Sequence, residues 1–436
     1  MITSDVWKEI IADQAKEPGV MALAVRRDDL VLHPLRGKAT IITGSRRAGK
    51  STYLRQWLEE HRGSHPILSL NFVDERLGEV NAPDLGGMIT AFQEDHPAVS
   101  RSTPSILCLD EIQRVNGWEL FVERQLRLGL FEIFLTGSSA RMFSADIATE
   151  MRGRSLRHEL FPFSFREFLR GRKVSEGNSS AERALIRKAW REYSVIGGFP
   201  EVVLAPAASR KPILQEYFAT WVTRDLVERL QLPSAPAARA FLKKLLLQFS
   251  APMTLNRFIE RLKAQGHGIG RENAARLLAA AEDAYVAFTV PILSESVHQQ
   301  QTRPKKIYAI DVGLPAALSV SRNDDAGRRL ENLVFLELKR QSLDIRYFLT
   351  PQGHEVDFVV PGQPPIQCCY TLADEETQNR ELRALEAAMV SLGSREALIL
   401  THDEEGSHRV KGVGEIEILP AWKWLLAKKK RPPRLK

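Results

Sequence analysis

One stretch of sequence decides the fold of the first part of this chain, TIITGSRRAGKST at residues 40–52. Its opening TIIT is typical of a buried strand, and the GSRRAGKS that follows matches the pattern GxxxxGK[ST]. The two glycines of this pattern let the backbone curl so that successive N–H groups point inward, and a helix that begins there adds the positive end of its dipole. We therefore predict a strand, a loop that binds nucleotide phosphates, and a helix. The predicted loop residues are Gly44, Ser45, Arg46, Arg47, Ala48, Gly49, Lys50, Ser51 and Thr52.

Four residues are predicted to carry the chemistry of this site. Lys50 is expected to contact the β and γ phosphates, and the Ser51 hydroxyl to coordinate Mg²⁺. Further along the chain, the apolar run SILCLD ends in Asp110 and is followed by Glu111. A carboxylate at the carboxyl end of a parallel strand faces the crevice that holds the nucleotide. Asp110 is therefore predicted to bind the Mg²⁺, and Glu111 to polarise the attacking water.

Two further catalytic candidates follow the next apolar run, FEIFLT. Thr136, Ser138 and Ser139 come at its end, where a polar side chain can hydrogen-bond the γ phosphate or the lytic water. We choose Ser138, and an ordinary serine turn is the alternative. Arg154, in MRGRSLRHEL, is a candidate arginine finger for its own or a neighbouring subunit. The alternative for Arg154 is a strand-edge residue that discourages aggregation or pairs with a carboxylate.

The order of apolar runs predicts the organisation of the chain. Through the first 162 residues they alternate with amphipathic stretches, which is typical of a parallel sheet with crossover helices, and RSLRHEL is the predicted fifth strand. The pattern then turns helical. Residues 238–295 offer two helices around the turn HGIG and then the strand-like VAFTVPIL, as in a winged helix-turn-helix. Arg271 and Arg276 on the second helix are candidates for DNA contact, although its Ala/Leu-rich character also suits internal packing.

Taken together, these motifs resemble one family. Bacterial and archaeal AAA-type ATPases with an uncharacterised carboxyl-terminal domain are similar to this chain in ITGSRRAGKST, NFVDERL, LDEIQRVNGWE, FLTGSSA, RGRSLRHELFPFSFREFL and GGFPEVV. Their terminal domain is similar to it in TRDLVERL, YAIDVGL, LENLVFLELKR and EVDFVV. The resemblance implies an ATPase of the additional-strand catalytic-glutamate class with ATP and Mg²⁺ as cofactors, then a winged helix and a restriction-endonuclease-like domain. The choice of adenine rests on this resemblance alone.

We therefore expect an α/β protein with three parts. A P-loop AAA-type parallel-sheet domain is followed by a helical and winged-helix region and by a carboxyl-terminal PD-(D/E)xK-like α/β domain. The expected bounds are 1–162 for the ATPase domain, 163–236 for a helical connector, 237–310 for the winged helix, 311–426 for the terminal domain and 427–436 for a basic tail.

The terminal domain has an incomplete nuclease motif. A PD-(D/E)xK site needs an acidic residue on a helix, an Asp on a strand, and then Glu or Gln followed two residues later by Lys. Glu331, Asp357 and Gln367 fall on those elements in order, but the lysine position holds Cys369, which cannot stay cationic beside a phosphate. Lys339, on the preceding helix, is the candidate replacement. The alternatives are a nuclease and a nuclease-shaped scaffold kept for binding or assembly, and we favour the scaffold.

Composition limits the remaining choices. The chain has 436 residues, of which 44% are hydrophobic and 26% charged, which suits a globular protein of two or three domains and argues against disorder. It has three cysteines and no apolar run of the ~18 residues that a membrane span needs, so we expect a cytoplasmic protein. The net charge is +7, and the last residues, KKKRPPRLK, are strongly basic. This tail either contacts nucleic acid or an acidic membrane surface, or is simply solvated.

Three functions are compatible with these observations. The leading hypothesis is ATP binding and hydrolysis coupled to binding of a polymer, with DNA as the expected partner. The first rival is a nucleotide switch similar to STAND-type ATPases, which acts on a protein partner. The second is an ATP-regulated nuclease. A homo-oligomer is compatible with all three.

Overall fold

Two units make up the chain, Met1–Phe161 and Pro162–Lys436. The computed structural model describes residues 2–16, 25–27, 30–61, 63, 65–137, 151, 153–232, 234–319, 325–341 and 343–427. Within those residues no helix combines the length and the apolar character needed to cross a membrane. The boundary between the units adjoins the predicted end of the first domain at 162, and the divisions predicted within 163–426 stay predictions.

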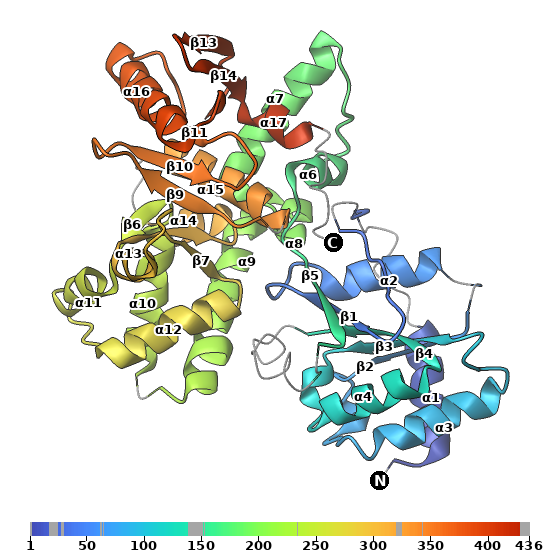
Figure 1. Cartoon of the computed structure of the whole chain (residues 1–436). Helices are drawn as coiled ribbons and strands as arrows, with labels where there is room; N and C mark the ends of the chain where they lie inside the picture. The colour runs from blue at the N-terminus through green and yellow to red at the C-terminus, as the bar shows by residue number, and fades with distance from the viewer. Residues whose placement is uncertain are drawn as a thin grey trace. The chain divides into compact units, whose positions relative to one another are not determined.

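The first unit is built on a sheet of five parallel strands in the order β2-β3-β4-β1-β5 (Figure 1). The predicted fifth strand is confirmed as β5. Strand β4 lies between β1, which leads into the phosphate loop, and β3. The strands are β1 (Ala39–Thr43), β2 (Ile67–Asn71), β3 (Ser105–Asp110), β4 (Phe131–Thr136) and β5 (Ser155–Glu159), and the helices are α1 (Ser4–Lys16), α2 (Lys50–Glu60), α3 (Leu85–Asp95) and α4 (Trp118–Leu128), with short 3-10 turns at Glu75–Leu77 and Ile112–Arg114.

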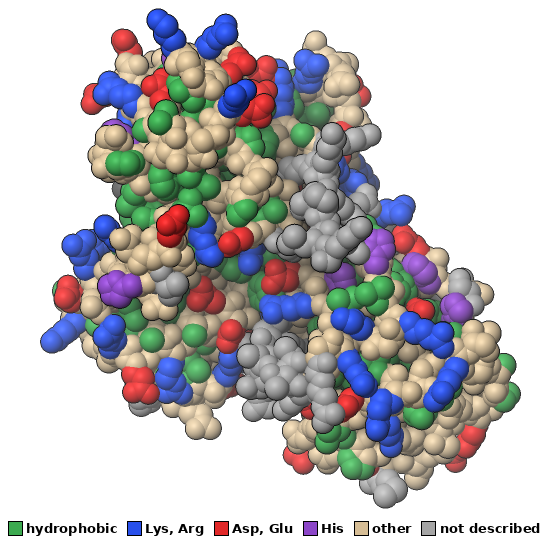
Figure 2. All heavy atoms as spheres, in the orientation of Figure 1, with side chains coloured by type: hydrophobic (Ala, Val, Ile, Leu, Met, Phe, Trp, Pro, Cys, Tyr) green, Lys and Arg blue, Asp and Glu red, His purple; other side chains and the backbone are tan. Residues whose placement is uncertain are grey.

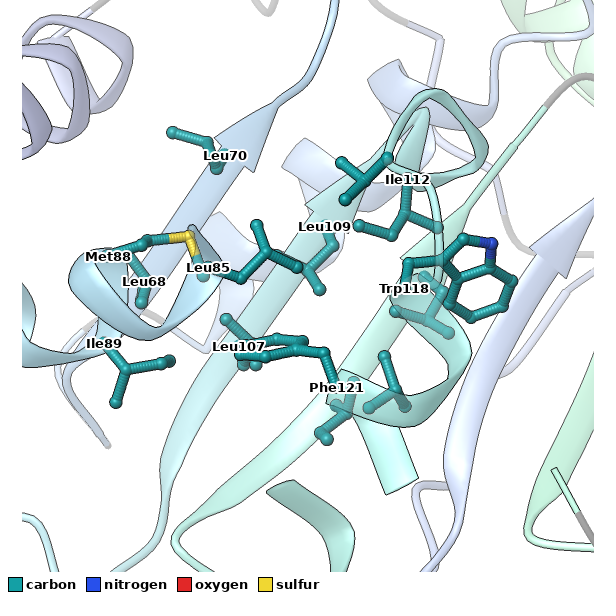
Figure 3. Packing of buried hydrophobic residues seen from close by; sticks show 14 of the residues in the cluster. Leu68, Leu70, Leu85, Met88, Ile89, Leu107, Leu109, Ile112, Trp118 and Phe121 are labelled. Atoms are coloured by element: carbon teal, nitrogen blue, oxygen red, sulfur yellow. The ribbon is translucent and has the colours of Figure 1, made fainter. Parts of the chain in front are cut away.

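Alternation along the strands divides the core of this unit between the two faces of the sheet. On one face, Leu107 and Leu109 of β3 pack with residues of α1, α3 and α4, and Figure 3 shows them with Leu85 and Phe121. On the other face, their chain neighbours Ile106 and Cys108 pack against α2. Parallel strands are buried on both faces and therefore read as continuous apolar runs. This is why the sequence revealed them.

The second unit begins with helices. A capping box starts each of the first two helices. The hydroxyl of Ser164 accepts a hydrogen bond from the N–H of Glu167, and the Glu167 carboxylate accepts one from the N–H of Ser164. Ser179 and Glu182 do the same in the second helix. A π-helical segment, Trp221–Glu228, continues α9 directly. The helices are α6 (Phe165–Gly171), α7 (Ser180–Ile196), α8 (Pro200–Leu204), α9 (Ala207–Thr220), α10 (Ala235–Leu247), α11 (Leu255–Lys263), α12 (Arg271–Asp283) and α13 (Val297–Thr302).

Two sheets complete the second unit. The first is an antiparallel sheet in the order β6-β8-β7. Along the chain, β6 comes between α10 and α11, and β7 and β8 come after α12. A mixed sheet in the order β13-β14-β12-β11-β10-β9 comes after it, with β11, β12 and β14 parallel and the other pairs antiparallel. The remaining elements are β6 (Ala251–Met253), β7 (Ala287–Val290), β8 (Lys305–Ala309), α14 (Gly313–Leu318), α15 (Ala326–Arg340), β9 (Arg346–Leu349), β10 (Glu355–Val359), β11 (Ile366–Cys368), α16 (Glu375–Leu392), β12 (Glu396–Thr401), β13 (Gly406–Val410), β14 (Gly414–Pro420) and α17 (Ala421–Leu426).

Asp311 joins two segments of the second unit that lie far apart in the sequence. Its carboxylate accepts hydrogen bonds from the N–H groups of Gly198 at 2.6 Å and Gly313 at 2.8 Å. Burial raises the pKa of Asp311 to about 7, although these N–H donors oppose the shift. Gly197 has φ +75°, and a Cβ added there would lie 1.9 Å from Asp311 Oδ1. The motifs GGFPEVV and YAIDVGL therefore pack together only because glycine occupies position 197.

Gly197→Ala is expected to lower the free energy of unfolding of the second unit by more than about 2 kcal/mol, because it combines a disfavoured backbone conformation with a collision at Asp311. Gly78 is the matched control: its φ of 52° and ψ of −132° lie in the same region as the φ of 75° and ψ of −161° at Gly197, and a Cβ added there meets nothing within 4 Å. Gly78→Ala should therefore lose less stability, because it carries the backbone strain without the collision. Chemical denaturation measures both losses, and equal losses would contradict the role given to the Asp311 contact.

Candidate functional site

The predicted phosphate loop begins directly after β1 and runs into α2. Gly44 has φ +144°, and a Cβ added there would lie 2.1 Å from the carbonyl oxygen of Leu160. Gly49, with φ +94°, and Arg47, with φ 65°, also take positive values. Only glycine fits the close approach at position 44. The glycine spacing of the motif therefore has a direct steric cause in this fold.

Lys50 is held over the loop. Its ammonium donates hydrogen bonds to the carbonyl oxygens of Gly44 and Ser45, both at 2.9 Å. The loop is held from outside by the buried Arg27, which donates to the carbonyl oxygens of Ala48 at 2.9 Å and Phe161 at 2.6 Å. Sequence analysis missed Arg27, because a single arginine outside the motif has no spacing that would mark it.

Asp110 ends β3 and lies near the loop, as predicted. Its carboxylate accepts a hydrogen bond from the hydroxyl of Thr136, the last residue of β4. Ser51 lines the same cavity as Asp110, so the two predicted Mg²⁺ ligands are neighbours. Burial raises the pKa of Asp110 above its usual value, while Thr136, Ser51 and Lys50 favour the charged form.

Thr136, the last residue of β4, contacts the site. It was one of three polar residues considered there, and its side chain is fully buried against Asp110. Ser138, the residue chosen, and Ser139 lie outside the described residues. The sequence gives no basis for preferring Thr136, because each of the three is a small hydroxyl residue after the same strand.

Glu111 has an unusual backbone conformation. Its φ of 57° and ψ of 36° are left-handed, which is uncommon for a residue other than glycine. Strained conformations of this kind are concentrated at active sites. The Glu111 carboxylate accepts a hydrogen bond from Gln113 Nε2 at 2.5 Å. The side chain predicted to act as general base is thus oriented by a neighbour.

A cavity of about 370 Å³ opens beside Ser51 and Asp110. Gln14 of α1 and Asn71 of β2 are also among its lining residues, and Asn71 is in register with Asp110. Gln14 makes two hydrogen bonds to the backbone of Asn71. Its Nε2 donates to the carbonyl oxygen at 3.2 Å, and its Oε1 accepts from the N–H at 2.7 Å. The cavity therefore adjoins the predicted Mg²⁺ ligands on the side of the edge strand β2, and residues 44–50 of the loop do not line it.

Arg154 lies at the opposite end of the sheet from the phosphate loop. Its carbonyl oxygen accepts a hydrogen bond from the N–H of Ala39, where β1 begins, at 2.8 Å. At ~3.3 Å per residue, the length of β1 separates the two ends by roughly 16 Å. Arg154 thus lies away from the phosphate loop of its own chain, and its role as an arginine finger, in its own or a neighbouring subunit, stays a prediction. Arg157 lies nearer the loop, with Nε 3.4 Å from Thr43 Oγ1.

The two predicted DNA-contacting arginines are exposed on α12. Arg271 is at the amino end of the helix. Arg276 donates a hydrogen bond to the carbonyl oxygen of Leu230 at 3.0 Å, so it is partly engaged within the protein. The apolar residues of α12 face inward, which reconciles its Ala/Leu-rich sequence with an exposed basic side. They are Ala274, Leu277, Ala280 and Ala281.

Glu331 and Asp357 come together in the second unit, around a lysine that sequence analysis missed. Lys306 Nζ lies 2.8 Å from Glu331 Oε1 and 2.7 Å from Asp357 Oδ1. Burial and the charge of Asp357 raise the pKa of Glu331 to about 7. Lys306 belongs to β8, which precedes the predicted terminal domain. Spacing within that domain therefore gave no signal for it.

The other two residues considered for a nuclease-like site are engaged elsewhere. Gln367 Oε1 accepts a hydrogen bond from the N–H of Asp357 at 3.0 Å, and its amide nitrogen donates to Glu381 at 2.7 Å. Lys339 lies over the ring of Phe288, 5.8 Å from the ring centroid. Neither directs its side chain to the cluster around Lys306.

Comparison with known proteins agrees with the fold and the site of the first unit. A model described as AAA domain matches residues 36–169, and one described as domain of unknown function (DUF8612) matches residues 187–325. The first unit is thus an AAA-type ATPase domain with a P-loop. The second model runs from within α7 through the three-stranded sheet, and it includes only residues 311–325 of the predicted terminal domain.

Two proteins of undefined role are related to the chain. Uncharacterized protein MJ1544 of Methanocaldococcus jannaschii is 33% identical over 436 residues, covering 97% of this chain and 95% of that protein. The chain therefore belongs to the same family as MJ1544. An uncharacterized protein of Haemophilus influenzae is 29% identical over 332 residues, covering 73% of this chain and 78% of that protein.

A solved structure, the Walker-type ATPase PABY2304 of Pyrococcus abyssi, shares 17% identity with a TM-score of 0.43. The match covers 64% of this chain and 90% of that one. A likeness this distant carries no functional argument.

Lys50→Met is expected to weaken Mg-ATP binding at least about tenfold, because it removes a charge-assisted contact to the phosphates. Lys38→Met is the matched control, since Lys38 directly precedes β1 at the opposite end of the strand. Titration with a fluorescent ATP analogue measures the Kd of each variant. Similar affinities for the two variants would contradict the assignment of Lys50.

Proposed function

We propose that this protein binds and hydrolyses ATP with Mg²⁺ and couples the nucleotide state to the binding of a polymer, with DNA as the partner. One observation carries the ATPase half: Asp110 accepts a hydrogen bond from Thr136 and shares a cavity with Ser51, at the carboxyl edge of the parallel sheet. Three separate strand ends supply these groups and the loop. Chance placement of polar residues does not give this agreement of motif, strand order and contact.

The residues present fit a magnesium ion. The Ser51 hydroxyl and the Asp110 carboxylate offer the hard oxygen ligands that Mg²⁺ prefers, directly or through water. When bound, Mg²⁺ supplies charge neutralisation to the transferring phosphate. Thr136 keeps the Asp110 carboxylate in position, Lys50 supplies positive charge at the β and γ phosphates, and Glu111 orients the attacking water and accepts its proton.

The proposal of a DNA partner rests on the basic surface of the region between α10 and β8. We interpret its helices and its β6-β8-β7 sheet as a winged helix, with Arg271 exposed on the second helix of the turn. On α11, Arg257 and Arg261 are exposed one turn apart. Burial and the nearby Arg261 lower the pKa of Lys244 on α10. Crowded cations of this kind favour an anionic polymer.

The steady-state ATPase rate with and without DNA tests the proposal. The wild-type rate is expected to rise severalfold with DNA. Glu111→Gln should lower kcat at least ~10²-fold, because it removes the general base while keeping the shape of the side chain. Its Kd for Mg-ATP should stay close to the wild-type value. Turnover that does not change across single- and double-stranded DNA would refute the DNA partner and favour a switch that acts on protein.

Arg271→Ala tests the DNA-binding surface separately from hydrolysis. It should weaken DNA binding and reduce the slope of log Kd against log salt by about 1, because one phosphate contact is lost. Arg187→Ala is the matched control, since Arg187 is an exposed arginine on α7. Fluorescence anisotropy at several salt concentrations measures both. If the two variants bind DNA equally well, α12 is not the contact surface.

A further inference from the structure

The carboxylate cluster of the second unit is centred on the ammonium of Lys306. Its Nζ lies 2.7 Å from Asp357 Oδ1, and 2.8 Å from both Glu331 Oε1 and Glu355 Oε1. An ammonium has three N–H donors. Lys306 donates a hydrogen bond to Asp357 and forms ion pairs with Glu331 and Glu355, so carboxylates surround the ammonium.

Lys306 is buried and charged. Its side chain is 1% exposed. Burial by itself would lower the pKa of Lys306, but Asp357 and the other acidic neighbours raise it well above its usual range. The ammonium is therefore a permanent cation in the interior of the second unit.

The carboxylates are fixed in place by further donors. The Tyr308 hydroxyl donates to Glu331 Oε1 at 2.7 Å, and the N–H of Cys368 donates to Asp357 Oδ2 at 2.8 Å. Next to Glu331 on α15, Asn332 binds the N–H and the carbonyl oxygen of Ala309 at 2.8 and 2.9 Å. Strand β8 is thus attached to α15 through residues 306, 308 and 309.

The groups that would complete a metal-dependent nuclease site are not directed at this cluster. Cys369, in the lysine position of the motif, donates from Sγ to the carbonyl oxygen of Thr371 at 3.0 Å. Gln367 Oε1 accepts a hydrogen bond from the N–H of Asp357. Throughout the part of the chain that the structure describes, no three His, Cys, Asp or Glu side chains are arranged to hold a metal ion.

We propose that Lys306 is the built-in cation of this cluster: its ammonium occupies the position that a PD-(D/E)xK-type nuclease gives to a divalent metal ion, and it joins β8 to α15 and β10. The terminal domain is then a nuclease-shaped scaffold without metal chemistry. Its acidic residues serve to hold the β6-β8-β7 sheet against the mixed sheet. Neither statement depends on ATP hydrolysis by the first unit.

Competition for the same oxygens explains why the ammonium excludes a metal ion. The oxygen atoms of Glu331, Glu355 and Asp357 that face the centre already lie in direct contact with the ammonium of Lys306. A divalent ion would have to displace the ammonium, and a buried cation without its partners is strongly destabilising. Removing the ammonium should instead leave a cluster of carboxylates that repel one another and bind a hard divalent cation.

The experiment is a thermal unfolding series on the full-length, nucleotide-free chain, in EDTA and in millimolar Mn²⁺. Lys306→Met should melt on the order of 10 °C below wild type in EDTA, because it leaves buried carboxylates unpaired, and Mn²⁺ should restore most of that loss. Lys305→Met is the matched control on the neighbouring residue of β8 and should melt within about 2 °C of wild type in both conditions.

Wild type and Asp357→Asn form the second comparison, which stands even if Lys306→Met does not fold. The two should show the same small response to Mn²⁺, and neither should cleave DNA in Mg²⁺ or Mn²⁺. The proposal fails if wild type gains stability from Mn²⁺ that Asp357→Asn loses, or if it cleaves DNA in a manner that Asp357→Asn abolishes. It also fails if Lys306→Met melts like wild type, or folds but is not stabilised by Mn²⁺.

Discussion

The nucleotide site depends on the parallel pairing of β1, β4 and β3. Parallel strands end at the same edge of a sheet, so the loop after β1, Thr136 at the end of β4 and Asp110 at the end of β3 are brought within contact of one another. The close approach of Gly44 to Leu160 ties the loop to the end of β5 as well. A shift of any of these strands by one residue would turn a functional side chain to the other face.

The second unit is organised by buried polar contacts in addition to its apolar core. Asp311 holds two glycine-containing segments through backbone N–H groups, and Lys306 gathers three carboxylates from α15 and β10. Buried charges are stable only when they are fully paired. Backbone N–H groups hold Asp311, and the ammonium of Lys306 offsets the charge of its carboxylates. The short motifs YAIDVGL, LENLVFLELKR and EVDFVV each supply one side of such a contact.

Sequence reasoning succeeded where the signal was local. The strands of the first unit could be predicted because burial on both faces gives continuous apolar runs. The phosphate loop could be predicted because its glycines are required sterically and lie within a few residues of one another. It did not show where Arg154 lies, because closeness in the chain to the end of β4 suggested closeness in space. The parallel pairing of β5 with β1 instead puts the residue before β5 at the far edge.

By itself, the sequence determined the phosphate loop, the two carboxylates at the end of β3 and the alternation of strands and helices around them, because each of these depends on neighbouring residues and leaves a fixed spacing. Only the tertiary structure decided that Thr136 positions Asp110, that Arg27 holds the loop, and that Lys306 fills the acidic cluster of the second unit. These contacts join residues 21 or more positions apart in the chain. Their partners are chosen by packing, and packing leaves no spacing in the sequence.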